Sequence, residues 1–180
     1  RGLIETIANA GAILKDNPEK FVDLLLKINK LVEGKTLNLR GHLFELAVGF
    51  YHSRSCSIIE IGKRIMGLDV EIDVYAVYPN FIHVVECKGY KNPLRREVVR
   101  KWLKETVPMI RKWLLTQDVS TNKEIVFEIW STGGFDPEAQ FLLERSSQLI
   151  KKYSIRYFGR NEILAKSQEV NNPRFIEILK

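Results

Sequence analysis

The fold is decided by the stretch LDVEIDVYAVYPNFIHVVECK, which runs from Leu68 to Lys88. Apolar and polar residues alternate on both sides of Pro79-Asn80, and this period of two is typical of β-strands joined by a turn. We therefore predict one strand over Leu68–Tyr78 and a second over Phe81–Lys88, paired as an antiparallel hairpin.

The acids of this hairpin are expected to share one face. In the first strand the even positions are apolar, whereas the odd positions begin with Asp69, Glu71 and Asp73. A four-residue loop from Tyr78 to Phe81 is favoured, because Pro79 cannot occupy the first position of a primed two-residue turn. That loop fixes a register with two pairs of opposed residues: Asp73 with Glu86, and Glu71 with Lys88.

Two opposed carboxylates need a positive partner. Directly opposed Cβ atoms lie roughly 4.5–5.5 Å apart, so Asp73 and Glu86 would repel each other. Oxygen ligands suit Mg²⁺ or Mn²⁺, which retain waters that can serve as reagents. Lys88 follows Glu86 on the same face, where it could polarise an attacking water or stabilise charge on a phosphate. We predict a divalent-metal site built from these three residues.

The flanking segments complete an α/β pattern. Helical periodicity covers residues 3–32, with a break at Asp16-Asn17-Pro18, where Asn17 or Asp16 can cap a second helix. After a break at Gly34-Lys35-Thr36, it resumes over Leu39–Tyr51. Further strands are expected at 57–61, 124–130 and 154–158, and further helices at 94–114 with a kink or split at Pro108, from Asp136-Pro137-Glu138 onward, and from 161 onward. This order implies a mixed sheet flanked by helices, with a right-handed crossover between the third and fourth strands.

Length and composition favour one domain with an appended segment. A chain of 180 residues buries one good core, and we divide it into an N-terminal helical segment, residues 1–34, and a domain, residues 35–180. It has no run of about 18 apolar residues to span a membrane. Two cysteines are too few for a disulfide framework, which favours a cytoplasmic setting. A start at Arg1 suggests a fragment of a longer parent protein with further domains.

The positive charge is concentrated after the hairpin. The chain has a net charge of +6, but residues 88–112 alone contain nine basic residues against two acids. Four of the basic residues form a stripe at helical spacing: Arg96, Arg100, Lys104 and Arg111. The simplest interpretation of this stripe is a helix face exposed to solvent. We favour contact with the phosphates of a nucleic acid. The residues predicted to bind nucleic acid are Lys91, Arg95, Arg96, Arg100 and Lys104.

The motif residues resemble a known superfamily. An acid, Asp73, followed by Glu86-Cys87-Lys88 at the end of an apolar strand, is similar to the PD-(D/E)XK phosphodiesterases, in particular Mrr-type restriction endonucleases and archaeal Holliday-junction resolvases. The run Gly41-His42-Leu43-Phe44-Glu45 resembles the helix that those families place before the sheet. The approach from Gly67 to Asp73 is also similar, and the likeness covers roughly residues 40–158.

The resemblance implies both a fold and an activity. The fold would be restriction-endonuclease-like, with a three-layer core. Asp73 and Glu86 would be metal ligands together with the backbone carbonyl of Cys87, Lys88 would be the catalytic lysine, and Glu45 a further ligand. The implied activity is Mg²⁺- or Mn²⁺-dependent endonucleolytic hydrolysis of DNA, by a restriction-type or effector domain of a larger protein.

Other functions remain open from the sequence. One alternative is a catalytically inactive nuclease-fold module that binds nucleic acid or takes part in assembly. Another is a nuclease acting on RNA or branched DNA. The N-terminal helices could form a homodimer surface or a link to a sensor domain.

Several residues have a simpler structural interpretation. Acids on a strand face are often merely solvated, and Glu45 could sit at the boundary of the core. Cys87 points away from the acids and is expected to be a small core residue rather than a nucleophile. Trp102 and Trp113 lie on an apolar stripe and are expected in the core. The three histidines show no ligand spacing and are expected to be structural or surface residues: His42, His52 and His83.

Overall fold

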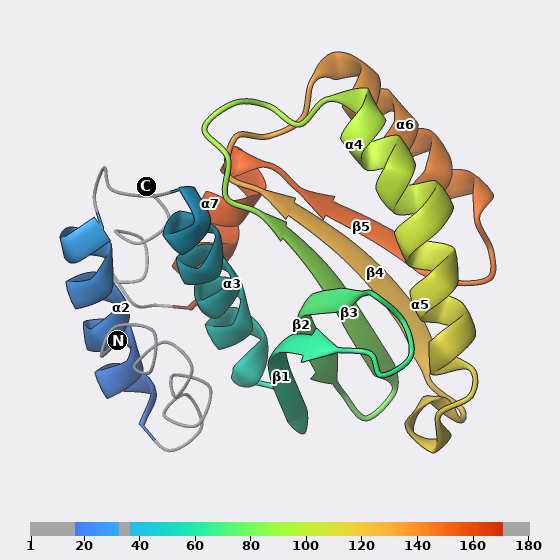
Figure 1. Ribbon diagram of the computed structural model, residues 1–180, viewed down its shortest axis with the longest axis horizontal. Coiled ribbons are helices and arrows are strands. Elements are labelled where there is room, and N and C mark those ends of the chain that lie inside the picture. The colour runs from blue at the N-terminus through green and yellow to red at the C-terminus, as the bar shows by residue number, and fades with distance from the viewer. Residues whose placement is uncertain (1–16, 33–36, 171–180) are drawn as a thin grey trace.

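Five strands in sequential order form a mixed sheet in the computed structural model, which describes residues 17–32 and 37–170 (Figure 1). The first three strands are antiparallel, and the third, fourth and fifth are parallel. The predicted mixed sheet flanked by helices is confirmed. The strands are β1 (Ile58–Arg64), β2 (Glu71–Val77), β3 (Phe81–Lys88), β4 (Glu124–Ser131) and β5 (Ser154–Phe158).

Helices cover both faces of this sheet. The helical elements are α2 (Pro18–Val32), α3 (Leu37–Ser53), α4 (Arg96–Lys101), the π-helical turn η1 (Trp102–Thr106), α5 (Val107–Leu114), the 3-10 turn η2 (Asp118–Ser120), α6 (Pro137–Leu149) and α7 (Arg160–Glu169). Figure 1 shows α3 and α7 on one face, α4, α5 and α6 on the other, and α2 outside α3. The first predicted helix and the break at residues 34–36 lie outside the described residues. No described helix is long and apolar enough to cross a membrane.

The helix α2 buries its apolar stripe within the same chain. Phe21, Leu25 and Ile28 are almost fully buried, and they pack in one cluster with residues of α3. The ring of Phe21 stacks on that of Phe50 with centroids 5.9 Å apart. The apolar side of α2 is therefore covered by α3.

Local capping signals placed two helix starts correctly. The backbone N–H of Lys20 donates to Asn17 Oδ1 at 3.1 Å, so Asn17 caps α2. The carboxylate of Asp136 accepts from the Ala139 N–H at 2.7 Å, directly before Pro137 at the first position of α6.

Pro108 splits the long helix by a π-turn. Proline has no backbone N–H to donate, and the N–H of Val107 bonds to the carbonyl of Trp102, five residues back. The extra residue in this turn rotates the residues that follow around the helix axis. Arg111 is half-buried and its guanidinium lies 5.8 Å from the centroid of the Tyr153 ring, whereas the other three residues of the predicted basic stripe are exposed.

The predicted register of the central hairpin is confirmed next to the loop, over Val74–Val77. β2 and β3 pair from Val77 opposite Ile82 to Val74 opposite Val85. The N–H of Tyr78 donates to the carbonyl of Phe81 at 2.8 Å, which closes the four-residue loop. The ladder ends at Val74, so the predicted pair of Asp73 with Glu86 is not part of it, and Asp73 instead accepts a hydrogen bond from the Cys87 N–H.

The beginning of the first predicted strand was wrong. Residues 65–70 form a tight turn, closed by the Ile65 N–H donating to the Val70 carbonyl at 3.1 Å, and β2 starts only at Glu71. Figure 1 shows this connection lying over the sheet on the side of α5. The turn buries apolar side chains of the edge hairpin in the cluster that includes residues of α4 and α5, which is the physical reason for the bend.

The bend also breaks the predicted single face of β2. Ile72 packs with the cluster on the α4–α6 side, whereas Val74 packs with α3, although both occupy even positions. Gly62, across from this point on β1, has φ +65°, which favours glycine. Glu71 therefore does not lie opposite Lys88, but forms an ion pair of 3.1 Å with Arg64.

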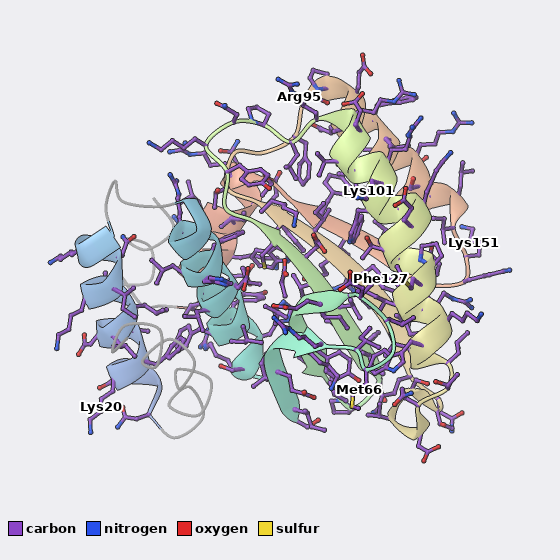
Figure 2. All side chains as sticks on the ribbon, in the orientation of Figure 1. Lys20, Met66, Arg95, Lys101, Phe127 and Lys151 are labelled. Atoms are coloured by element: carbon purple, nitrogen blue, oxygen red, sulfur yellow. The ribbon has the colours of Figure 1, made fainter. Side chains whose placement is uncertain are left out.

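Each face of the sheet has its own apolar cluster. On the α4–α6 side, the side chains of Ile82, Val84 and Phe127 are buried, and Figure 2 shows Phe127 inside the molecule. On the α3 side, Cys87 is 5% exposed and packs against Trp130. The expectation that Cys87 belongs to the core is confirmed, as it is for Trp102, which is also 5% exposed.

Candidate functional site

Asp73 lies where β2 separates from β3. The last paired residues of the ladder are Val74 and Val85, so the β3 backbone beyond them lacks a main-chain partner on β2. The carboxylate of Asp73 fills this gap, since its Oδ2 accepts a hydrogen bond from the Cys87 N–H at 2.7 Å. The strand backbone thus fixes the position of the acid.

Glu86 and Lys88 lie beside it on β3. Alternation along the strand places both on the face of Ile82 and Val84. The ammonium of Lys88 forms an ion pair with Oε1 of Glu86, and the two side chains are 23% and 19% exposed. Solvent and solutes can therefore reach this pair.

The helix α3 brings Glu45 to the same place. A Cβ at Gly89 would lie 3.3 Å from the carbonyl oxygen of Arg40 and from Cα of Gly41, so α3 passes directly over the end of β3. Glu45 follows one turn later with its side chain 15% exposed, and its Oε2 lies 3.1 Å from His42 Nδ1. Asp73 thus interacts electrostatically with Glu86, Glu45 and Lys88.

Electrostatics at this site disfavour the ionised form of Asp73. Burial, followed by the charges of Glu86 and Glu45, raises the pKa of Asp73 from 3.8 to about 7, although the Cys87 N–H and Lys88 oppose this shift. Burial lowers the pKa of Lys88, but the charge of Glu86 and its hydrogen bond outweigh that effect, so the pKa is raised. Three acids thus share one ammonium.

This donor set fits a hard divalent cation. Carboxylates of Asp73, Glu86 and Glu45, with the carbonyl of Cys87, provide only oxygen, which Mg²⁺ and Mn²⁺ prefer. Among the described residues, these three acids do not bring one ligand oxygen each within 4.8 Å of one another. Because Mg²⁺ keeps several waters, it does not need direct contact with all of them.

The predicted nucleic-acid-binding residues are all exposed, and they follow the site directly in the chain. They lie on the connection that leaves β3 and on the helix it enters: Lys91, Arg95, Arg96, Arg100 and Lys104. Figure 2 shows Arg95 on the periphery of the molecule, near the start of α4. Arg96 is partly neutralised, since its Nη1 lies 3.2 Å from Oε2 of Glu138.

The sequence did not predict that two of the histidines lie together. The structure brings His52 and His83 together around Glu128, although all three are far apart in the sequence. His83 Nδ1 lies 2.8 Å from Oε1 of Glu128, and His52 Nε2 lies 3.3 Å from its Oε2. The sequence signal was Glu128, which has apolar neighbours on both sides in the interior of β4.

Glu128 is ionised despite its burial. Burial alone would raise its pKa, but hydrogen bonds and charges from the two histidines lower the pKa below its usual value. The indole N–H of Trp130 also donates to Oε2 at 2.8 Å. Charge is therefore retained at a position that is 2% exposed.

Ser131 was not predicted, but it lies next to the first site. It pairs with Lys88 in the β3–β4 ladder, so the two side chains share a face. Its hydroxyl is buried and has no hydrogen-bond partner.

Comparisons of the chain with family models, curated proteins and solved structures found no match.

Proposed function

We propose that this chain is a metal-dependent endonuclease domain that hydrolyses phosphodiester bonds of DNA, with a restriction-endonuclease-like fold of the PD-(D/E)XK type. One observation carries the proposal: Asp73, held by the Cys87 N–H, shares the end of β3 with Glu86, Glu45 and a lysine. An acid with a pKa near 7 among other acids is a strong attractor for a cation.

The residues of the candidate site would have different roles. Asp73, Glu86, Glu45 and the carbonyl of Cys87 would hold Mg²⁺ or Mn²⁺. When bound, the ion supplies Lewis-acid polarisation of the phosphate and neutralises its charge. Lys88 would orient the attacking water through its ammonium, or stabilise the charge that develops on the phosphate oxygens. Its ion pair with Glu86 supports this role, because it holds the ammonium at the site.

A cleavage assay tests this function. Supercoiled plasmid is incubated with the 180-residue chain in Mg²⁺, Mn²⁺ or EDTA, beside a Lys88→Ala variant purified in the same way. We expect nicked and linear products only from the wild type with metal. Equal cleavage by the variant would contradict the assignment, since the activity would then come from elsewhere.

A substrate panel separates the alternatives. Duplex DNA, single strands, a four-way junction and RNA are compared at one metal concentration, and preferential cleavage of the junction or RNA would redefine the substrate. Salt-dependent binding to DNA without cleavage in any metal would identify an inactive module instead.

The basic helix gives a separate prediction for binding. Replacing both Arg100 and Lys104, which are exposed on α4 and η1, with alanine should weaken duplex binding. The slope of log K against log salt should become shallower by about two, because two phosphate contacts are lost. Fluorescence anisotropy in Mg²⁺-free buffer, over a salt series, measures both effects.

The matched control removes the same charge elsewhere. Lys151 and Lys152 are also exposed, but they precede β5, and their double alanine variant should leave the slope unchanged. If the two double variants behave alike, α4 does not contact the phosphates.

A further inference from the structure

A second group of candidate ligands lies between the C-terminal part of α3 and the sheet. His52 on α3, His83 on β3 and Glu128 on β4 place one ligand atom each within 4.8 Å of the others. All three residues are buried, with exposed fractions of 2%, 8% and 2%. Their convergence from three elements makes the group part of the folded core.

Both histidines direct a ring nitrogen at the carboxylate of Glu128. His52 Nδ1 is joined to the hydroxyl of Tyr78 by a hydrogen bond of 2.8 Å. His52 Nε2 is buried and lies 3.3 Å from Oε2 of Glu128, compared with 2.8 Å between His83 Nδ1 and Oε1. Both imidazoles therefore direct a nitrogen at one buried carboxylate, an arrangement that a bound cation would stabilise.

The surroundings hold the candidate ligands in place. The Trp130 indole N–H donates to Oε2 of Glu128 at 2.8 Å, which orients the carboxylate. The Tyr78 hydroxyl does the same for the ring of His52. Metal ligands in proteins are commonly fixed by such outer hydrogen bonds.

We propose that His52, His83 and Glu128 form a binding site for Zn²⁺ or a similar divalent transition-metal ion. Two imidazoles and one carboxylate are a donor set that suits Zn²⁺. Tetrahedral bonds of about 2.0–2.2 Å separate the ligand atoms by roughly 3.3–3.6 Å. One ligand atom from each residue lies within 4.8 Å of the other two, and the nitrogens of His83 and His52 lie 2.8 Å and 3.3 Å from the two different oxygens of Glu128, so side-chain adjustment would bring the three atoms to that spacing.

A pocket provides access to this site. It has a volume of about 530 Å³, and the three ligand residues contribute to its lining. Its walls also include three basic side chains: Arg54, Arg156 and Lys166. The pocket admits the ion, and the fourth position of a tetrahedral site can take a water or an anion from it.

This site is independent of the proposed nuclease site. His52 lies seven residues after Glu45 on α3, which is about 10 Å along the helix axis. His83 and Glu128 lie on the α3 side of the sheet, near Trp130, whereas Glu86 and Lys88 share the opposite face. Imidazole nitrogen selects for Zn²⁺, while the oxygen-only set at Asp73 suits Mg²⁺.

Direct metal titration tests the proposal. The full chain is stripped with EDTA, dialysed and titrated with ZnCl₂ by calorimetry, and with Co²⁺ as an optical probe of four-coordinate geometry. We expect one tight Zn²⁺ per chain in the wild type and in Asp73→Asn, with the affinity lowered more than about 100-fold in His83→Gln and Glu128→Gln. His42→Gln, which changes an exposed histidine on the same helix, is the matched control and should bind as the wild type does.

Two further measurements keep the result decisive if a buried variant does not fold. Tyr78→Phe retains all three ligands and should weaken Zn²⁺ binding about tenfold. Anomalous scattering at the zinc edge, from crystals soaked in ZnCl₂, should place an ion within about 2.3 Å of all three ligand atoms. The proposal is overturned if the wild type binds no Zn²⁺ stoichiometrically, if Asp73→Asn abolishes binding, or if the ligand variants bind like the wild type.

Discussion

Replacing Asp73 with asparagine should lower metal-dependent cleavage by about three orders of magnitude, and at the same time stabilise the metal-free protein at pH 8. The loss of activity follows from removing a charged ligand at the point where the ion would bind, since a single electrostatic group at such a centre contributes about 10²–10³-fold. Asparagine still offers an oxygen to the Cys87 N–H that now bonds Asp73.

The gain in stability follows from the pKa of Asp73. Folding raises this pKa from 3.8 to about 7, so the folded state binds a proton more tightly than the unfolded state does. The resulting stability is present below about pH 4 and is lost as the pH rises through 7. At pH 8 the ionised acid costs the folded state up to about 4 kcal/mol, which asparagine avoids.

Thermal unfolding in EDTA checks this second effect. The difference in free energy of unfolding between Asp73→Asn and the wild type should be largest at pH 8 and should fall steadily between pH 7 and pH 4. Asp69→Asn is the matched control, since Asp69 is an exposed acid of the same segment, and it should change neither cleavage nor stability. A variant at Asp73 that is inactive but less stable at pH 8 would show that the acid has a structural role.

Replacing Gly133 with alanine should destabilise the protein by about 3 kcal/mol or more. A Cβ at this position would lie 2.2 Å from the carbonyl oxygen of Asn92 and 2.9 Å from that of Tyr90. Both contacts are with backbone, so no side-chain rotation can relieve them. The loop is held further by the Leu94 N–H, which donates to the Gly134 carbonyl at 2.9 Å.

Urea denaturation compares this variant with Gly41→Ala. Gly41 lies within α3, and a Cβ there meets nothing within 4 Å, so alanine should stabilise the helix by up to about 1 kcal/mol. The two variants add the same methyl group, and only its surroundings differ. A Gly133→Ala midpoint equal to that of the wild type would mean that the loop from Tyr90 to Asn92 moves freely.

Local sequence signals were sufficient to predict the central loop and two helix starts. The Tyr78–Phe81 loop was predictable because Pro79 excludes the shorter turn, and this loop set the register of β2 and β3 as far as Val74 and Val85. Asp136 and Asn17 marked helix starts through hydrogen bonds that span only three residues. Interactions within one turn depend little on the rest of the fold.

Other features depended on packing that local patterns do not contain. The even residues of β2 follow one alternation, yet Ile72 and Val74 face different clusters because the edge hairpin bends over the sheet. Arg111 followed the helical spacing of the basic stripe, yet it lies half-buried beside Tyr153, beyond the π-turn before Pro108. Both errors came from extending a regular period through an irregular backbone.

The sequence by itself determined the α/β class, the hairpin and the residues at the end of β3, because alternation and turn chemistry act between neighbours in the chain. Only the tertiary structure decided that Glu45 meets Asp73 and that His52, His83 and Glu128 converge. These contacts join residues up to 76 positions apart, and their partners are chosen by how α3 packs across the sheet. Spacing along the chain contains no information about that packing.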